Sequence, residues 1–341
     1  MTTPEQLITN AWQNNSPALK ALAPLSALYG AVSGMRRLMY QRGVLTSYKA
    51  SVPVLVIGNI TVGGSGKTPL IIALVRYLQS RGVAVGVISR GYGRAESTPA
   101  LVVSNSTPKE VGDEPCLIVQ STGVAMAVGA NRGQAIDLLL STYPDTSFII
   151  SDDGLQHYAL HRDAEWIVVD KGRGFGNGKL LPQGFLREPV SRLEKSVVIY
   201  HDPSLATGGQ IADDRTMYLA PDKFMPLLTD NKDQAPAPPQ SVYALSGIGY
   251  PKRFFDTVQG LGFHVITKPF NDHHAFSLDD LMPLTDYPII TTAKDAVKLR
   301  QLATACQHDV FGRIWVLPVE ARLSQGVYDT MDELLTRLKI Y

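Results

Sequence analysis

The sequence predicts an α/β fold in which a parallel sheet covered by helices is followed by a smaller C-terminal α/β domain. Short apolar runs alternate with segments of helical periodicity, the pattern of parallel strands joined by helices. A proline-rich stretch at 221–240 interrupts this alternation, and 341 residues suffice for about two domains of ~150 residues. We therefore expect a helical N-terminal segment at 1–45, a main domain at 46–220, a linker at 221–240 and a second domain at 241–341.

The elements of the main domain follow from the positions of the apolar residues. The run at 52–60 carries no charge and is rich in β-branched residues, as is typical of a buried parallel strand. Residues 69–80 repeat apolar side chains at helical spacing and end at Arg81-Gly82, a basic last turn followed by a glycine cap. Further strands are expected at 83–89, 148–151, 166–170 and 196–200.

The second domain shows the same alternation on a smaller scale. Its expected strands are residues 242–246, 263–267 and 314–319, with a strand-helix unit at 289–302 and helices at 252–260 and 327–340.

Charge is distributed unevenly, although the formal net charge is only +1. Residues 1–95 contain ten basic side chains and one acidic side chain, Glu5, so this segment carries +9 and the remainder carries −8. Such asymmetry indicates that one end of the protein meets an anionic surface or ligand. The two cysteines, Cys116 and Cys306, match no zinc or disulfide spacing, and the first ten residues lack the basic region of a signal peptide.

Residues 17–42 predict a helix with two distinct stripes. The uncharged part, 21–35, is shorter than the ~20 apolar residues that a bilayer-spanning helix needs. One stripe holds Leu22, Leu25, Tyr29, Val32 and Met39, and the other holds Ser26, Gly30, Ser33 and Arg37. Because Arg36, Arg37 and Arg42 stand at its end, this helix either lies on an anionic lipid surface or packs against its own domain.

The strongest chemical signal is the glycine-rich turn between the first strand and the first helix of the main domain. It reads Gly58-Asn59-Ile60-Thr61-Val62-Gly63-Gly64-Ser65-Gly66-Lys67-Thr68. In this context the backbone N–H groups of Thr61 to Thr68 can surround phosphates, Lys67 can reach the β- and γ-phosphates, and Thr68 can ligate Mg²⁺. The main domain is therefore expected to be P-loop NTPase-like and to bind ATP, although Thr61 replaces the first glycine of the general pattern.

Two classes of P-loop protein are disfavoured. A guanine-specific GTPase should carry N-K-x-D, but Asn231-Lys232-Asp233-Gln234 lacks the final aspartate and lies in the linker. The membrane-associated partitioning ATPases have a lysine where this chain has Val62. A kinase or an unspecialised ATPase remains.

Carboxylates and arginines occur in three further motifs. Asp152-Asp153-Gly154 ends a buried strand, where a Walker-B aspartate would hold Mg²⁺, although such a sequence could also be a plain turn. Ser89-Arg90-Gly91-Tyr92 and Gly112-Asp113-Glu114 could clamp a phosphorylated substrate and supply a base, or lie in solvated loops. Asp272-His273-His274 could be a surface turn, a metal pair or a histidine that orients a base across the interdomain cleft.

Taken together, these motifs resemble the tetraacyldisaccharide 4'-kinases of Gram-negative lipid A biosynthesis. The likeness also rests on two longer segments, 181–189 (LPQGFLREP) and 292–299 (TAKDAVKL), and covers about residues 17–300. Thr61 in the phosphate loop is usual in this family. Ala293 departs from the family pattern, in which a glutamate is common, so the role of that position is in doubt.

The resemblance implies an ATP-dependent transfer of phosphoryl to the 4'-hydroxyl of a tetraacyl glucosamine disaccharide 1-phosphate, at the cytosolic face of the inner membrane. It implies Asp113 as general base with His273 as its partner, Lys67 as charge stabiliser, and a magnesium shell of Thr68, Glu114, Asp152 and Asp153. Candidate contacts to the lipid substrate are Arg90, Tyr92, Arg132, Gln156, His157 and Arg187. The expected partners are the lipid A precursor and the anionic membrane surface, without nucleic acid, and a monomer is expected. The alternative function is a membrane-associated P-loop ATPase that switches a protein partner.

Overall fold

The computed structural model describes residues 8, 11–94, 96–210, 214–228 and 234–340. Its main domain is built on a nine-stranded sheet with the order β14-β8-β7-β6-β1-β5-β2-β4-β3. Neighbouring strands pair in parallel except at the two edges, where β14 is antiparallel to β8 and β3 is antiparallel to β4. The strands of this sheet are β1 (Val54–Gly58), β2 (Val85–Ser89), β3 (Ala100–Val102), β4 (Ala125–Val128), β5 (Phe148–Asp152), β6 (Ala164–Asp170), β7 (Val197–His201), β8 (Thr216–Pro221) and β14 (Val319–Leu323).

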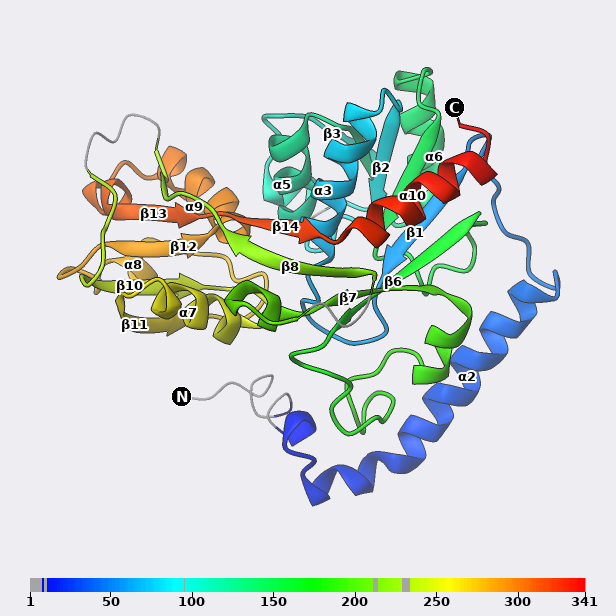
Figure 1. Cartoon of the computed structure of the whole chain (residues 1–341), viewed down its shortest axis with the longest axis horizontal. Coiled ribbons are helices and arrows are strands. Elements are labelled where there is room, and N and C mark those ends of the chain that lie inside the picture. The colour runs from blue at the N-terminus through cyan, green and yellow to red at the C-terminus, as the bar shows by residue number, and fades with distance from the viewer. Residues whose placement is uncertain (1–7, 9–10, 95, 211–213, 229–233, 341) are drawn as a thin grey trace.

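Helices cover both faces of this sheet, as Figure 1 shows. Along β1, Leu55 and Ile57 join one apolar core, whereas Val54 and Val56 join the other, since successive strand residues point to opposite faces. The first core contains α3 (Lys67–Ser80), α5 (Asp113–Thr122) and α10 (Gln325–Arg337), and the second contains α6 (Arg132–Thr142). The main domain is therefore the helix-covered, mostly parallel sheet that the sequence predicts.

The second domain is a five-stranded sheet with the order β11-β10-β12-β13-β9. Its elements are β9 (Met225–Pro226), β10 (Ser241–Ser246), α7 (Pro251–Gly260), β11 (His264–Pro269), α8 (Leu278–Leu281), β12 (Ile289–Thr292), α9 (Ala293–Ala305) and β13 (Ile314–Leu317). Helices α7 and α9 contribute to separate apolar cores on this sheet. Short helices, α4 (Pro108–Val111), η2 (Val190–Lys195), η3 (Pro203–Thr207) and η4 (Asp309–Arg313), complete the connections.

The C-terminal boundary of the second domain differs from the predicted one. After β13 the chain returns as β14, which pairs with β8 in the large sheet, and α10 then packs against α3. Tyr77 and Tyr328 lie with ring centroids 4.7 Å apart, and the Tyr77 hydroxyl donates to Asp332. The prediction that the second domain extends from 241 to 341 is therefore wrong from residue 319 onwards, because the apolar face of α10 is buried in the main domain.

The predicted linker, 221–240, also has a structural role. Its residues Met225–Pro226 form β9, which pairs with β13 at the edge of the second sheet. Figure 1 shows two chain connections between the sheets, one through β8 and one through β14. Asn231, Lys232 and Asp233, which were compared with the N-K-x-D element of GTPases, lie outside the described residues. The first seven residues and Tyr341 also lie outside them.

The N-terminal segment forms η1 (Pro17–Leu22) and α2 (Ala23–Gln41), which lie along the main domain (Figure 1). The stripe of small residues faces the protein: Ser26 donates to the carbonyl of Leu180, and a Cβ at Gly30 would lie 2.9 Å from a Leu180 methyl. Tyr29, on the predicted apolar stripe, also contacts the main domain, since its hydroxyl donates to the carbonyl of Arg187. Within the described part of the chain, no helix is long and apolar enough to cross a bilayer.

Candidate active site

The phosphate loop lies between β1 and α3, at the carboxyl end of a central strand of the large sheet. Gly63 and Gly66 have φ angles of +93° and +90°, a region that residues with a Cβ rarely adopt. Helix α3 starts at Lys67, two residues before the predicted start, so the first turn of the helix opens on the loop. The hydroxyl of Ser65 is buried without a hydrogen-bond partner among the described residues, and such a group is expected to face a ligand.

Lys67 points to the carboxylates at the end of β5. Its ammonium nitrogen lies 3.1 Å from Asn59 Oδ1 and 3.5 Å from Asp153 Oδ1. Arg187 also donates to Asp153, at 3.0 Å, and to Asn59. The loop is thus held by a small network of two cations, one carboxylate and one amide.

The neighbouring carboxylates Asp152 and Asp153 have opposite electrostatic environments. Burial would raise the pKa of Asp153, but Lys67 and Arg187 outweigh it and lower the pKa well below its usual value. Burial, followed by the charge of Glu114, raises the pKa of Asp152 to about 7. Both carboxylate oxygens of Asp152 are buried and lack a hydrogen-bond partner among the described residues.

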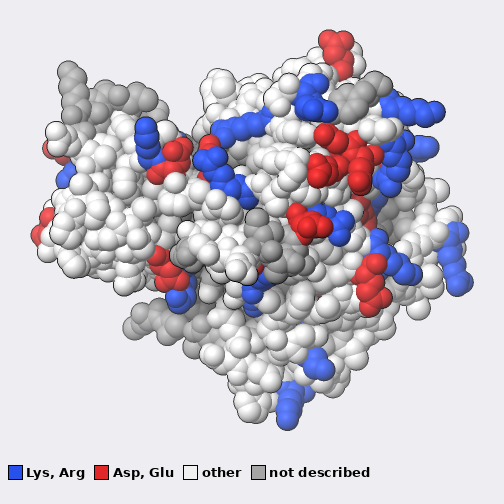
Figure 2. Space-filling model, in the orientation of Figure 1, with Lys and Arg blue, Asp and Glu red and all other residues white. Residues whose placement is uncertain are grey.

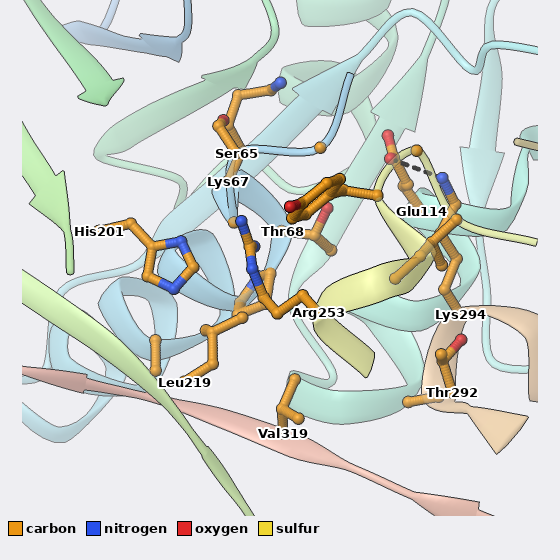
Figure 3. Close-up of a pocket in the computed structure, with 18 of the residues that line it drawn as sticks. Ser65, Lys67, Thr68, Glu114, His201, Leu219, Arg253, Thr292, Lys294 and Val319 are labelled. Carbon is orange, nitrogen blue, oxygen red and sulfur yellow. Dashed lines mark hydrogen bonds and ion pairs between the residues drawn. The ribbon is translucent and has the colours of Figure 1, made fainter. Parts of the chain in front are cut away.

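The predicted magnesium ligands do not form a ready-made cage. Asp153 is paired with cations, and Glu114 accepts a hydrogen bond of 3.1 Å from Lys294. Across the described residues, no group of three or more His, Cys, Asp or Glu side chains is arranged to hold a metal ion. Asp152 is the predicted ligand with a free buried carboxylate. Thr68, which is labelled in Figure 3, stands at the start of α3 and lines the same cleft.

The predicted pair Asp113 and His273 meets across the cleft between the domains. Asp113 begins α5 directly after Gly112. Gly112 has a φ of +97°, which favours glycine, and a Cβ at this position would lie 3.0 Å from the Tyr92 carbonyl oxygen. His273 comes from the loop after β11, with a φ of +59°. Its Nδ1 lies 3.1 Å from both carboxylate oxygens of Asp113, although the two residues are 160 positions apart.

The charges around this pair favour ionised Asp113. Burial alone would raise the pKa of Asp113, but the hydrogen bond from His273 and the charge of Lys294 lower it to about 2. For His273, burial lowers the pKa, yet the hydrogen bond to Asp113 outweighs it and the pKa is raised. The pair is therefore an ionised carboxylate that accepts a hydrogen bond from an imidazole across the cleft.

Lys294 forms a bridge beside this pair. It stands in the first turn of α9, and its ammonium lies 3.1 Å from Glu114 and 3.2 Å from Asp272. Figure 3 shows the contact between Lys294 and Glu114 as a dashed line on the side of the cleft away from His201. The second domain thus supplies both a histidine and a lysine to the two acidic residues that start α5.

The predicted phosphate-loop and substrate residues line one cleft of about 2720 Å³, with a single exception. Thr61 is buried outside the lining, and its hydroxyl accepts a hydrogen bond of 3.2 Å from Asn59. The lining includes all six predicted substrate contacts: Arg90, Tyr92, Arg132, Gln156, His157 and Arg187.

These six residues differ in their burial and in their contacts with other parts of the protein. Burial lowers the pKa of Arg132 to about 10 and that of His157 to about 4. Gln156 donates to Glu188 at 2.7 Å and accepts from Arg187 at 3.3 Å. Arg90 is exposed, and the ring of Tyr92 lies 4.9 Å from that of His273.

Some residues that organise the site were not assigned a role from the sequence. They include Arg173, Arg253 and Lys294, which line the cleft, and Asn59, which is buried behind the phosphate loop. Asn59 lies in the glycine-rich turn at 58–68 and Lys294 in the segment 292–299, so the sequence motifs could have indicated a functional role for both. Arg173, which donates to the carbonyl of Val62, and Arg253, which pairs with Asp170, lie in stretches without a recognisable pattern.

Comparison with known proteins agrees with this geometry. Residues 18–336 match the family described as tetraacyldisaccharide-1-P 4'-kinase, LpxK. The chain belongs to this kinase family. The 4'-kinase of Psychrobacter cryohalolentis is 52% identical, with 98% of this chain and 97% of the relative covered. That of Actinobacillus pleuropneumoniae serotype 5b is 44% identical over 96% of this chain and 99% of the relative.

A solved structure of the 4'-kinase family has the same fold. The crystal structure of LpxK from Aquifex aeolicus, in complex with ATP, has a TM-score of 0.75 and 26% sequence identity, and covers 95% of this chain and all of its own. Membership of the 4'-kinase family makes this protein a phosphotransferase of lipid A biosynthesis, as the motifs predicted. The predicted alternative, an ATPase that switches a protein partner, is not supported.

Proposed function

We propose that the protein transfers the γ-phosphoryl group of ATP to the 4'-hydroxyl of a tetraacyl glucosamine disaccharide 1-phosphate. The observation that carries this proposal is the contact of the buried Asp113 with His273, which lines the same cleft as Lys67 and Thr68. A phosphate-binding loop opposite a carboxylate that can accept a hydroxyl proton is the arrangement that phosphoryl transfer to an alcohol needs.

Lys67 and the backbone of the phosphate loop are proposed to bind the triphosphate. In the structure Lys67 is satisfied by Asn59 and Asp153, so binding requires its ammonium to exchange part of this contact for phosphate oxygens. The positive end of α3 points to the same place, which favours an anion there. The charge that spreads over the phosphoryl oxygens in the transition state is then stabilised by a group that is already in position.

Asp113 is proposed to accept the proton of the 4'-hydroxyl. Its low pKa keeps Asp113 ionised at neutral pH. His273 Nδ1 lies 3.1 Å from both carboxylate oxygens, so a hydrogen bond from His273 holds the carboxylate in position. A sugar hydroxyl becomes acidic only as its bond to phosphorus forms, so a weak base in the correct position suffices.

Mg²⁺ is proposed to bind beside the loop through Asp152 and the Thr68 hydroxyl. The two free, buried oxygens of Asp152 fit a cation, because an unpaired buried carboxylate is otherwise costly. Mg²⁺ commonly uses one or two carboxylates and completes its shell with water and substrate phosphates, so the absence of a three-carboxylate group among the described residues is compatible with it. When bound, the ion would neutralise charge on the phosphates.

The lipid is proposed to enter from the membrane surface along α2. The apolar side chains that α2 turns away from the protein are largely exposed, 61% for Leu28, 60% for Val32 and 66% for Met35. On the face drawn in Figure 2, the lower projection that α2 helps to form shows basic and uncharged side chains. An exposed apolar stripe with Arg36, Arg37 and Arg42 at its end suits the boundary of an anionic bilayer.

This arrangement supports a location at the cytosolic face of the bacterial inner membrane. Arg90, Arg132 and Arg187 line the same cleft and could recognise the 1-phosphate of the lipid. Every proposed site residue comes from one copy of the chain, so the proposal needs only a monomer.

Incubation with labelled ATP and a lipid A precursor extract tests the proposed reaction. Label should appear in the lipid, and label found only in free phosphate would contradict the kinase assignment.

Replacement of Arg36, Arg37 and Arg42 by glutamate tests the membrane proposal. Each basic residue near an anionic surface contributes about 1 kcal/mol, so the triple variant should lose co-sedimentation with phosphatidylglycerol vesicles by more than tenfold. The matched control replaces Arg76, Arg81 and Arg322, which lie on the main domain, and should leave vesicle binding unchanged. Equal binding by wild type and the α2 variant would contradict this part of the proposal.

A further inference from the structure

An ion pair joins the domains on the phosphate-loop side of the cleft. Arg253, in the first turn of α7, donates to Oδ2 of Asp170, the last residue of β6. Only 20% of the Arg253 side chain and 5% of the Asp170 side chain are exposed. The adjacent pair Lys252 and Asp256 lies within α7, and its side chains are 68% and 56% exposed. Arg253 therefore forms a largely buried ion pair between the domains, whereas Lys252 forms an exposed ion pair within one helix.

Asp170 is connected to the phosphate loop by two routes. Its Oδ1 accepts the N–H groups of Gly172 and Arg173, and the guanidinium of Arg173 donates to the carbonyl of Val62 in the loop. On the other side, His201 Nδ1 lies 3.9 Å from Asp170 Oδ2. A Cβ at Gly66 of the loop would lie 3.3 Å from the same His201 nitrogen.

The charge of Asp170 is unfavourable for a triphosphate unless a cation offsets it. Asp170 is buried, so solvent screens its negative charge only weakly. His201 does not supply the missing charge, because burial and the charge of Arg253 lower its pKa to about 4 and its Nδ1 has no hydrogen-bond partner among the described residues. Arg253 brings a full positive charge directly onto the carboxylate, and Figure 3 shows it beside His201, next to the start of α3.

The same segment of the second domain also covers the loop. Gly249 stands four residues before Arg253, and a Cβ at Gly249 would lie 2.9 Å from the backbone nitrogen of Gly64 and 3.3 Å from Gly63 Cα. The contact of Arg253 with Asp170 and the contact of the 247–250 turn with the loop are therefore made by one segment of the second domain.

We propose that Arg253 is a positioning residue, which docks on Asp170 when the second domain closes and thereby strengthens ATP binding at the phosphate loop. The guanidinium neutralises the buried carboxylate behind the loop, so the closed arrangement binds a triphosphate more tightly than the open one. By linkage, ATP in turn favours the closed arrangement. The inference rests on the proposed kinase function and adds how closure is coupled to ATP.

Calorimetric titration of the full-length protein with Mg·ATP, without lipid, tests this coupling. Arg253→Ala and Arg253→Gln should each raise the Kd for ATP about tenfold, whereas Arg253→Lys, which keeps the charge, should raise it less. The matched control Lys252→Ala removes a charge from the next position of the same helix and should bind ATP like the wild type. Melting temperatures identify any variant that fails to fold, in which case Arg253→Lys still tests the coupling through its smaller shift.

The Asp170→Asn variant separates the proposed route from direct contact with the nucleotide. Because the amide has no negative charge to offset, Arg253→Ala should change the Kd less than twofold in that background. An unchanged Kd in the single Arg253 variants would overturn the proposal, and so would an equal loss in the Asp170→Asn background, which would show that Arg253 acts on ATP itself. Failure of lipid phosphorylation with the predicted changes in Kd intact would contradict the proposed function and leave this coupling standing.

Discussion

The two sides of the cleft are assembled in different ways. The phosphate-loop side is one continuous stretch, in which β1, the glycine-rich turn and α3 follow each other along the chain. The base side joins Asp113 of the main domain to His273 of the second domain, 160 positions away. The first side is thus determined by local backbone geometry, whereas the second exists only because the two domains meet.

This difference implies that the two sides respond to different changes. Damage to the phosphate loop should weaken ATP binding in any domain arrangement, since Lys67 and the loop glycines belong to one domain. Damage to the Asp113–His273 pair should slow the chemical step and change ATP binding little, because the contact of Arg253 with Asp170 still joins the domains on the phosphate-loop side. The variants below test that division.

The largest effect is expected from Asp113→Ala. Loss of a positioned general base costs about 10²–10⁴-fold in rate, and we expect turnover to fall about 10³-fold. Calorimetry should show ATP binding within twofold of wild type, because Asp113 is not part of the phosphate loop. Glu110→Gln, an exposed acidic residue in the preceding turn, is the control and should retain turnover. Turnover near wild type in Asp113→Ala would exclude this residue as the base.

A smaller loss of turnover, with a loss of ATP binding, is expected from Lys67→Met. Removal of one positioned charge at a developing anion costs on the order of 10²-fold in kcat. Since Lys67 also belongs to the loop, the Kd for ATP should rise at least severalfold in calorimetry. Lys195→Met is the control, because Lys195 is exposed at the end of η2, before the start of β7, and should leave both quantities unchanged. If Lys67→Met bound ATP as tightly as the wild type, the phosphate-loop side would not differ from the base side in its effect on ATP binding.

The smallest effect is expected from His273→Gln, and its size should depend on pH. The pKa of His273 is raised in the folded protein, so its pair with Asp113 stabilises the closed protein fully below the unfolded histidine pKa of about 6.5. This stabilisation is lost as pH rises through the folded pKa, while Asp113 stays ionised throughout. A hydrogen bond to a charged group contributes about 1.5–3 kcal/mol, so the melting temperature of His273→Gln should lie a few degrees below wild type near pH 6.

The matched control for this measurement is His274→Gln. His274 contacts Asp280 at 3.0 Å within the second domain, so its loss does not affect a contact between domains. The difference between wild type and His273→Gln should shrink toward pH 9. A difference that grew with pH would show that the pair is held by neutral histidine, contrary to the direction of the shift.

Much of the site could be predicted because its signals are local. The turn at 58–68 and the Asp152-Asp153 strand end need only a strand, a tight turn and a helix, and these follow from a few neighbouring residues. The partners of these groups could not be predicted in the same way. That Asp153 is occupied by Lys67 and Arg187, and Glu114 by Lys294, depends on loops and a second domain far away in the chain.

The fold shows the same division. Periodicity predicts the strands with long apolar runs, but β4, β8 and β14 are short or only partly buried, and the return of 319–340 to the main sheet has no local signal. For α2, periodicity predicts two stripes but not which one is covered. The loop at 180–187 determines that, because it offers Ser26 and Tyr29 carbonyl partners and leaves Leu28 and Met35 exposed.

The sequence by itself therefore determined the phosphate loop, the strand-end aspartates and the uneven charge of the first 95 residues, since each depends on neighbouring residues. Only the tertiary structure decided which cation meets which carboxylate and which face of α2 meets solvent. Asp113 with His273 and Asp170 with Arg253 are contacts between domains. Their geometry comes from how two sheets, joined through β8 and β14, close on one another, and no short stretch of sequence contains that information.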